Sequence, residues 1–73
     1  MRELEPVYLC YDELEAVRLC DVEKLTQQQA GDRMGVSRGT VQRLVDSGRK
    51  KMTEAIVMGC ALVIEAMNTD DSR

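Results

Sequence analysis

Residues 25–45 read LTQQQAGDRMGVSRGTVQRLV and carry the strongest local signals for the fold. Thr26 is a preferred helix N-cap, and Gln29 stands at the reciprocal position three residues later, which makes a capping box. Gly35 suits the left-handed conformation in which helices commonly end. Ser37 is a second N-cap only two residues further along. The stretch therefore predicts one helix that ends at Gly35 and another that begins after Ser37.

The second helix is predicted to be long. Small or apolar residues recur every three or four positions along it, at Val41, Val45, Gly48, Met52, Ala55 and Gly59. This period is typical of a helix with one buried stripe, and it extends from Arg38 to about Met58. Ser47 and Gly48 are expected to be a weak point, and Gly59 is the expected terminator.

Two helices joined by such a short turn form a helix-turn-helix arrangement. Ala30 and Gly31 are small residues placed just before the turn. A glycine inside a helix costs up to ~1 kcal/mol relative to alanine. We expect close approach of the two helices at Gly31 in return.

If Val41, Leu44 and Val45 face inward, the residues left outward at the start of the second helix are Arg38, Gly39, Gln42, Arg43 and Asp46. Arginine can form bidentate hydrogen bonds to guanine, and glutamine can do so to adenine, in the major groove of DNA. This face therefore predicts base contacts by four residues, Arg38, Gly39, Gln42 and Arg43.

Phosphate contacts are expected around the same face. Helix N-termini offer free N–H groups to anions, and basic or hydroxyl side chains bind phosphate without reading sequence. The residues of this kind are Thr26, Gln27, Arg33, Ser37, Thr40, Arg49, Lys50 and Lys51. The competing interpretation is that the charged face is only solvated, and that the helix pair has a structural or protein-binding role.

The charge is unevenly distributed. The chain has a net charge of −3, but residues 33–51 hold six basic residues against one acidic residue, Asp46, a net charge of +5. The rest of the sequence has four basic and twelve acidic residues. Because salt screens each charge beyond about 10 Å, a local cluster can bind a polyanion despite an acidic total.

The terminal segments predict two short strands, at residues 5–10 and 61–65, that pair with each other. Residues 61–65 could also continue as helix, but their β-branched residues and the preceding glycine favour a strand. Between the first strand and Leu25, Asp12 and Glu15 have capping-box spacing and predict an additional helix. The expected fold is mainly α, a helix-turn-helix domain of three to four helices with two short terminal strands. It should occupy residues 1–67, with the motif at 26–46 and a disordered tail at 68–73.

Several classes of function are not indicated. The sequence has no histidine and only three scattered cysteines, so we expect no metal site, no cofactor and no enzymatic activity. It contains no apolar run near the ~20 residues of a membrane span and does not begin like a signal peptide. A cytoplasmic protein without membrane contact is expected.

Residues 25–52 resemble region 4 of bacterial sigma factors, which reads the −35 promoter element. The sequence is more similar to a family of small prokaryotic sigma-region-4-like proteins, through ELEPV, DELEAVRL, LTQ, GVSRGTVQRL and ALVIE. This resemblance runs from Glu3 to Glu65 and covers most of the chain. The sequence departs from that family at Cys60 and Val63, where relatives tend to be basic. The resemblance implies a DNA-binding, regulatory protein. By position it implies that Arg38, Gln42 and Arg43 face bases and that the phosphates are faced by Thr26, Gln27 and Ser37.

The expected function is sequence-specific binding of double-stranded DNA by a transcriptional regulator, as a homodimer. Dimerisation would double the phosphate contacts and support a small core. The alternative is a protein-interaction module, similar to sigma region 4, that docks on RNA polymerase or another regulator.

Overall fold

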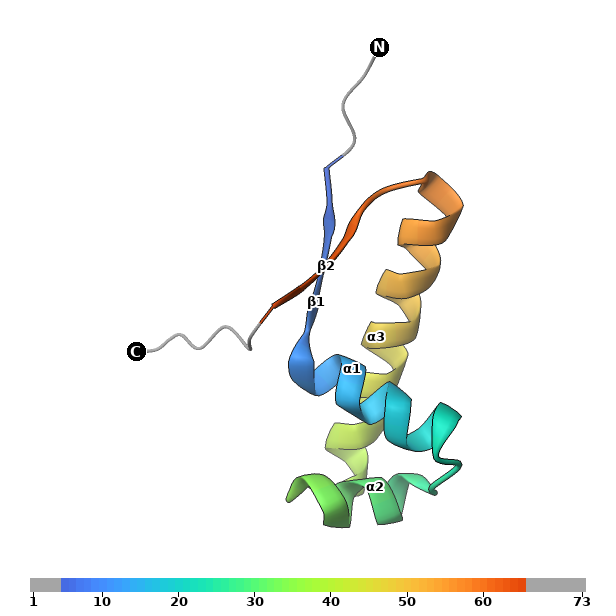
Figure 1. The fold of residues 1–73 in the computed structure, drawn as a ribbon. Helices are drawn as coiled ribbons and strands as arrows, with labels where there is room; N and C mark the ends of the chain where they lie inside the picture. Colours follow the sequence, from blue (N-terminus) through green and yellow to red (C-terminus); the bar gives the residue numbers. More distant parts are fainter. Residues whose placement is uncertain (1–4, 66–73) are drawn as a thin grey trace, which may run out of the picture.

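The protein is described here by a computed structural model that covers residues 5–65. The element order is β1 (Val7–Cys10), α1 (Tyr11–Val17), a π-helical turn η1 (Arg18–Val22), α2 (Gln27–Met34), α3 (Arg38–Met58) and β2 (Leu62–Glu65). The fold is mainly helical with two short strands. Figure 1 shows that α1 and α2 cross the N-terminal half of α3, while the strands lie toward the other end of this helix.

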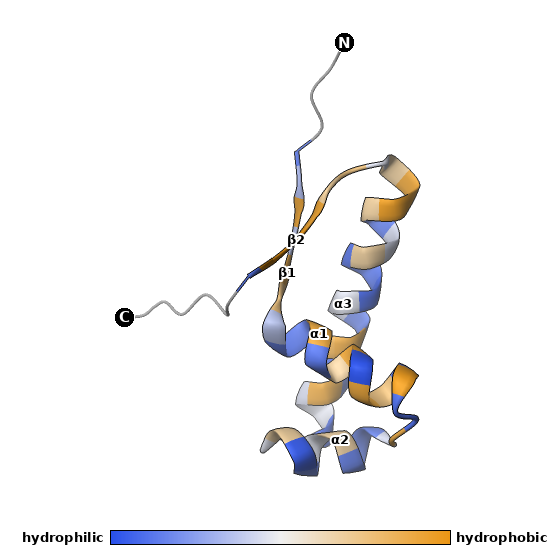
Figure 2. Cartoon of the chain, in the orientation of Figure 1, coloured by the Kyte–Doolittle hydropathy of each residue, from blue (hydrophilic) through white to orange (hydrophobic). Residues whose placement is uncertain are grey.

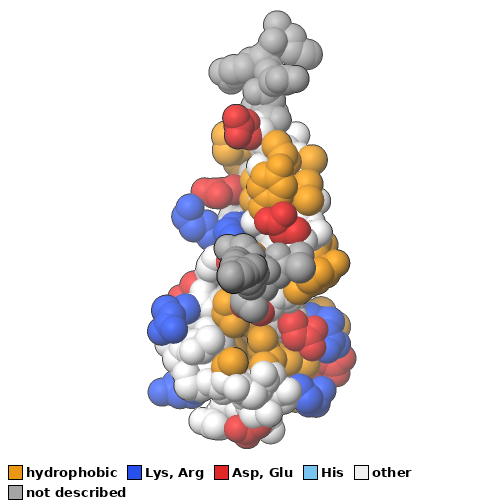
Figure 3. Space-filling model, turned by 90° about the vertical axis from the view of Figure 1, so that its left-hand side faces the viewer, with side chains coloured by type: hydrophobic (Ala, Val, Ile, Leu, Met, Phe, Trp, Pro, Cys, Tyr) orange, Lys and Arg blue, Asp and Glu red, His pale blue; other side chains and the backbone are white. Residues whose placement is uncertain are grey.

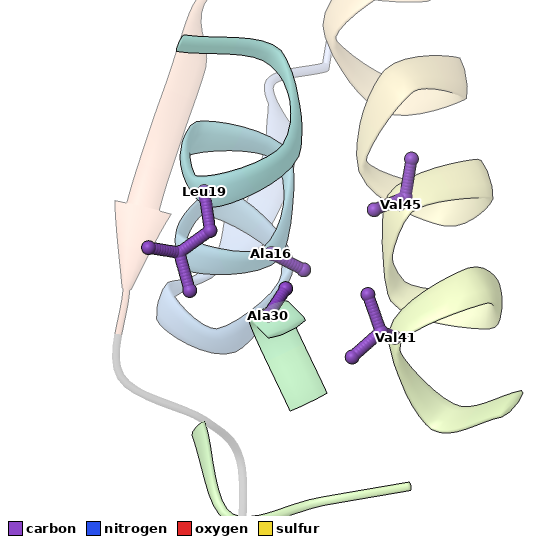
Figure 4. Close-up of a cluster of buried hydrophobic side chains, with 5 residues drawn as sticks. All are labelled: Ala16, Leu19, Ala30, Val41 and Val45. Carbon is purple, nitrogen blue, oxygen red and sulfur yellow. The ribbon is translucent and has the colours of Figure 1, made fainter. Parts of the chain in front are cut away.

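The core lies where the helices meet. Its five fully buried side chains come from α1, η1, α2 and α3, and they are Ala16, Leu19, Ala30, Val41 and Val45 (Figure 4). Leu25, Met34 and Leu44 pack around this cluster and remain partly exposed. The small side chains of Ala16 and Ala30 let three helical segments approach one another closely.

The first helix begins earlier than the sequence predicted. The backbone N–H of Cys10 donates a hydrogen bond of 2.9 Å to Oε1 of Glu13, so Cys10 is the N-cap and the helix begins at Tyr11. The prediction that Asp12 and Glu15 form the capping pair was wrong. Glu15 instead accepts hydrogen bonds from the guanidinium of Arg18 one turn later. Both pairs, Cys10 with Glu13 and Asp12 with Glu15, have the three-residue spacing of a capping box. β1 ends at Cys10, so the helix begins directly after it.

α2 and α3 begin and end where the sequence predicted. The Thr26 side chain accepts from the N–H of Gln29 at 3.0 Å, and the Gln29 side chain accepts from the N–H of Thr26 at 2.9 Å. Gly35 ends α2 with φ of 78°. Ser37 caps α3 by accepting from the N–H of Thr40 at 3.2 Å. Gly59 ends α3 in the left-handed region.

The expected weak point in α3 is not a break, because this helix continues through Ser47 and Gly48. A Cβ added at Gly48 would lie 2.9 Å from a methyl carbon of Val17 and 3.2 Å from the carbonyl oxygen of Glu13. The glycine lets α1 lie directly against α3, and this contact fixes where the two helices cross.

The predicted strand pairing is confirmed, and its direction is parallel. Val7 pairs with Leu62, and Cys10 pairs with Glu65. A parallel pair needs a long crossover, which the helices between the strands supply. Leu9 is fully buried, whereas β2 is exposed along its whole length. The predicted disordered tail at 68–73 lies outside the described residues.

Candidate nucleic-acid interface

The angle between α2 and α3 depends on Gly31. A Cβ at this position would lie 2.6 Å from the carbonyl oxygen of Val36, closer than real side chains come. The carbonyl of Gly31 also accepts hydrogen bonds from the N–H groups of Gly35 and Val36, at 2.8 and 2.9 Å. The turn is thus folded tightly onto α2. The close approach expected at Gly31 is therefore to the backbone of the turn and of the first residue of α3, Arg38. This packing fixes the direction in which α3 leaves the turn.

The start of α3 separates apolar from polar side chains. Val41 and Val45 are fully buried in the core. The four residues predicted to contact bases are all exposed and come from the first two turns: Arg38, Gly39, Gln42 and Arg43. Within residues 5–65 the side chains of Arg38, Gln42 and Arg43 make no hydrogen bond or ion pair. This face can therefore accept an external partner without breaking an internal contact.

The hydroxyl groups predicted to contact phosphate already have capping roles. Thr26 and Ser37 accept from backbone N–H groups, and Oγ of Ser37 also donates to Oγ1 of Thr40 at 3.0 Å. Thr26 and Ser37 are exposed, whereas Gln27 and Thr40 are half-buried. Both N-caps lie at the ends of α2 and α3 that carry free N–H groups, where an anion is favoured.

The basic residues predicted to contact phosphate fall into two groups. Arg33 is exposed and has no ion pair within residues 5–65. The other three lie on α3, and each forms an ion pair with a carboxylate. Arg49 donates two hydrogen bonds to the carboxylate of Asp21, at 2.6 and 3.1 Å, and Lys50 contacts Glu54 at 2.8 Å. Lys51 contacts Glu13 at 2.9 Å. A phosphate would compete with a carboxylate at each of these three.

Glu13 is the one acidic residue buried in the described part of the chain. Its carboxylate accepts hydrogen bonds from the Ser47 hydroxyl and from Nζ of Lys51, both on α3, and from the N–H of Cys10. Burial alone would raise the pKa of Glu13, but these donors outweigh burial and hold this pKa below its ordinary value. The carboxylate thus ties β1 and α1 to α3.

This network was not predicted from the sequence. Glu13 lies 34 positions from Ser47 and 38 from Lys51, and no local pattern joins residues so far apart. The Asp21–Arg49 pair is a second long-range tie, and the guanidinium lowers the pKa of the Asp21 carboxyl. Both ties attach α3 to the segment that precedes α2. They hold α3 in a defined orientation, but their side chains are not among the residues predicted to contact bases.

Residues 5–65 contain neither a metal-binding cluster nor a helix that could span a membrane. No group of three or more cysteine, aspartate or glutamate side chains there is placed to hold a metal ion. In the same residues, no helix combines the length and the apolar character that a membrane crossing requires.

Known proteins resemble this chain over almost its whole length. Residues 1–71 match a family described as protein of unknown function DUF134. The chain belongs to this family. A UPF0251 protein of Thermococcus kodakarensis is 54% identical over 59 residues, which are 81% of this chain and 52% of the relative. A UPF0251 protein of Moorella thermoacetica is 49% identical over 65 residues, which are 89% of this chain and 44% of the relative.

The chain spans about half the length of these curated DUF134 relatives. A UPF0251 protein of Vibrio parahaemolyticus is 51% identical over 61 residues, or 84% of this chain and 64% of the relative. No solved structure shows significant similarity to this chain. Membership of DUF134 therefore names no function for this chain. A functional proposal has to be based on the exposed residues at the start of α3.

Proposed function

We propose that this chain binds double-stranded DNA sequence-specifically as a transcriptional regulator, with α2 and α3 acting as a helix-turn-helix like that of sigma region 4. The start of α3 enters the major groove, and Arg38, Gln42 and Arg43 contact base edges. Gly39 lets the helix backbone come close to the DNA. The main support is that Arg38, Gln42 and Arg43 are exposed and make no hydrogen bond or ion pair within residues 5–65, while Val41 and Val45 of the same turns are buried.

The charges around this face suit the same partner. Arg33 and the capped N-termini of α2 and α3 offer contacts to phosphates on either side of a groove. Arg49, Lys50 and Lys51 lie further along α3 and already neutralise carboxylates. We therefore assign most of the phosphate binding to Arg33 and the helix N-termini, with a smaller contribution from the three paired residues.

The test is selection of bound duplexes from a random DNA pool at two salt concentrations. The proposal predicts a recovered sequence motif, and an affinity that falls with salt with a slope of about −0.9 for each neutralised phosphate. Recovery of no motif, with binding that ignores salt, contradicts it. In that event, capture of purified RNA polymerase by the same chain would support the alternative function as a protein-interaction module.

A further inference from the structure

Within residues 5–65, one edge of β2 has no strand beside it and carries free backbone hydrogen-bonding groups. The N–H of Val7 donates to the carbonyl oxygen of Ala61 at 2.9 Å. Since backbone groups along a strand point alternately to its two sides, Ala61 and Val63 direct their N–H and C=O groups toward β1. Leu62 and Ile64 direct theirs away from β1. Within residues 5–65 no strand pairs with that outer edge.

The side chains of the strand pair are also exposed. Parallel sheets are normally covered on both faces, and an isolated two-stranded sheet is marginal in water. Here Leu62, Val63 and Ile64 are 38%, 37% and 42% exposed, and Tyr8 beside Val63 is 49% exposed. β2 also lacks the lysine, proline or bulge that usually protects an edge.

The last turn of α3 also exposes hydrophobic side chains. Ile56, Val57 and Met58 are 81%, 75% and 58% exposed. Figure 3 shows hydrophobic side chains gathered on the upper part of the molecule, at the height of the strands and the C-terminal half of α3. At about 25 cal/mol per Å², the 1.5–3 kcal/mol typical of burying a Val, Leu, Ile or Met side chain corresponds to roughly 60–120 Å² each. The seven partly exposed residues together therefore expose several hundred Å². A standard interface takes roughly 800 Å² from each partner.

We propose that a second copy of this chain covers this surface, with β2 pairing antiparallel to its counterpart across a two-fold axis to make a four-stranded sheet. A strand that meets its own copy across such an axis runs antiparallel. The two outer strands of the sheet would be β1 of each copy.

One register uses every outward-facing group. Leu62 pairs with Ile64 of the second copy, and each residue then exchanges both backbone hydrogen bonds with its partner. Val63 lies on the axis opposite Val63 of the second copy. On that face Tyr8 flanks Val63 in each copy, which gives a continuous apolar row. Glu65 stands opposite Ala61, so no like charges meet, and the surface is complementary to itself.

The dimer contact does not depend on the proposed DNA contact. The strands lie toward the C-terminal end of α3, and this helix of 21 residues is about 30 Å long. Two copies joined through β2 would leave both polar faces at the start of α3 free. Failure of the dimer would therefore leave the DNA proposal standing, and the reverse also holds.

The first test is the mass of the full 73-residue chain in solution, without DNA, by sedimentation equilibrium at tens of micromolar. We expect about twice the monomer mass of 8.2 kDa. Ile64→Pro removes an N–H that points away from β1, so it should halve the mass while helical circular dichroism stays unchanged. Ile64→Val is the matched control and should remain dimeric. A monomeric wild type, as expected if another segment or another protein covers β2, overturns the proposal.

The second test fixes the register and does not depend on a proline variant that folds. In a Cys60→Ser background, Val63→Cys should oxidise to a disulfide-linked dimer, because two residues facing across the axis have Cβ atoms about 4.5–5.5 Å apart. Leu62→Cys faces Ile64 of the second copy and should crosslink at least about tenfold more slowly. Equal crosslinking of the two variants, or a dimer that persists in Ile64→Pro, would place the contact elsewhere and contradict the proposal.

Discussion

The two ends of α3 expose opposite kinds of side chain, although they belong to one continuous helix. At its N-terminal end the apolar side chains are buried and the exposed residues are arginine and glutamine. At its C-terminal end Ile56 and Val57 are the most exposed large hydrophobic residues in the described part of the chain. Figure 2 shows the same contrast, with hydrophobic residues at the end of α3 that adjoins β2. The first end suits a charged, hydrated partner, and the second suits an apolar one.

The largest effect is expected at the polar end. Arg43→Glu removes a candidate base contact and adds repulsion from phosphate, so affinity for the selected DNA should fall at least about 100-fold. The helix content and unfolding midpoint should stay unchanged, because Arg43 is exposed and unpaired in the described residues. Fluorescence anisotropy measures the affinity.

A matched pair of variants separates charge from location. Arg43→Gln and Arg18→Gln each remove one positive charge, but Arg18 lies on η1 and pairs with Glu15 and Glu23. Only Arg43→Gln should weaken DNA binding by more than a few-fold. Equal losses for both variants would mean that total charge, and not the face of α3, governs binding.

The next effect concerns the fixed angle between α2 and α3. Gly31→Ala would press its Cβ against the carbonyl of Val36, so we expect a loss of about 1–3 kcal/mol in unfolding free energy. Gly39→Ala adds the same methyl group where the nearest atom is 4.0 Å away, and it should not destabilise the fold. Urea unfolding measures both. If Gly31→Ala were as stable as Gly39→Ala, the angle would not depend on close approach at Gly31.

Features of the fold that depend on residues close in sequence could be predicted, and features that depend on long-range packing could not. The caps at Thr26 and Ser37, the terminator glycines and the period of α3 predicted both helices because each signal acts within a few residues. The start of α1 was predicted wrongly because Glu15 stands three residues after Asp12, just as Glu13 stands three residues after Cys10, and the sequence alone does not show which pair forms the cap. The π-helical turn and the parallel direction of the strands depend on packing, and no local pattern encodes them.

The candidate site divides in the same way. The exposure of Gln42 and Arg43 follows from the helical period, so it was predictable. Arg38 lies three residues before Val41, in line with the buried stripe, and it is exposed as the first residue of α3. The pairing of Arg49 and Lys51 was not predictable, because Asp21 and Glu13 come from distant parts of the chain. Those carboxylates change which basic residues are free for phosphate. The residues on one face of a helix can be predicted from the sequence. The carboxylates that pair with its basic residues can be identified only when the fold is known.

A smaller effect is expected where the middle of α3 meets α1. Glu13→Gln keeps the shape of the side chain but weakens its charge-assisted hydrogen bonds, so it should cost about 1–2 kcal/mol at pH 7. The pKa of Glu13 is lowered in the folded state, so its contribution is present above the unfolded pKa of about 4.3 and is lost as pH falls further through the folded pKa. The stability difference between wild type and Glu13→Gln should shrink on acidification. A difference that stays constant down to pH 3 would contradict this assignment.

The smallest effect is expected at an exposed ion pair. Lys50 and Lys51 are neighbours, but Lys50 contacts the exposed Glu54 and Lys51 contacts the buried Glu13. Lys50→Gln should change the unfolding free energy by no more than about 0.5 kcal/mol, as is usual for surface pairs. Lys51→Gln should cost more. Chemical denaturation in low salt compares the two directly, and the reverse order would show that burial of Glu13 does not matter.

The central claim is that the start of α3 reads bases, and the most direct measurement is a base-by-base affinity profile of Arg43→Gln on the selected DNA. Arginine prefers guanine and glutamine prefers adenine. The account predicts a changed preference at one or two adjacent positions, with the other positions unaffected. Arg33→Gln, the phosphate control, should weaken all sequences alike. If Arg43→Gln also weakened every sequence equally, Arg43 would be a backbone contact and the proposed reading of bases by this face would be contradicted.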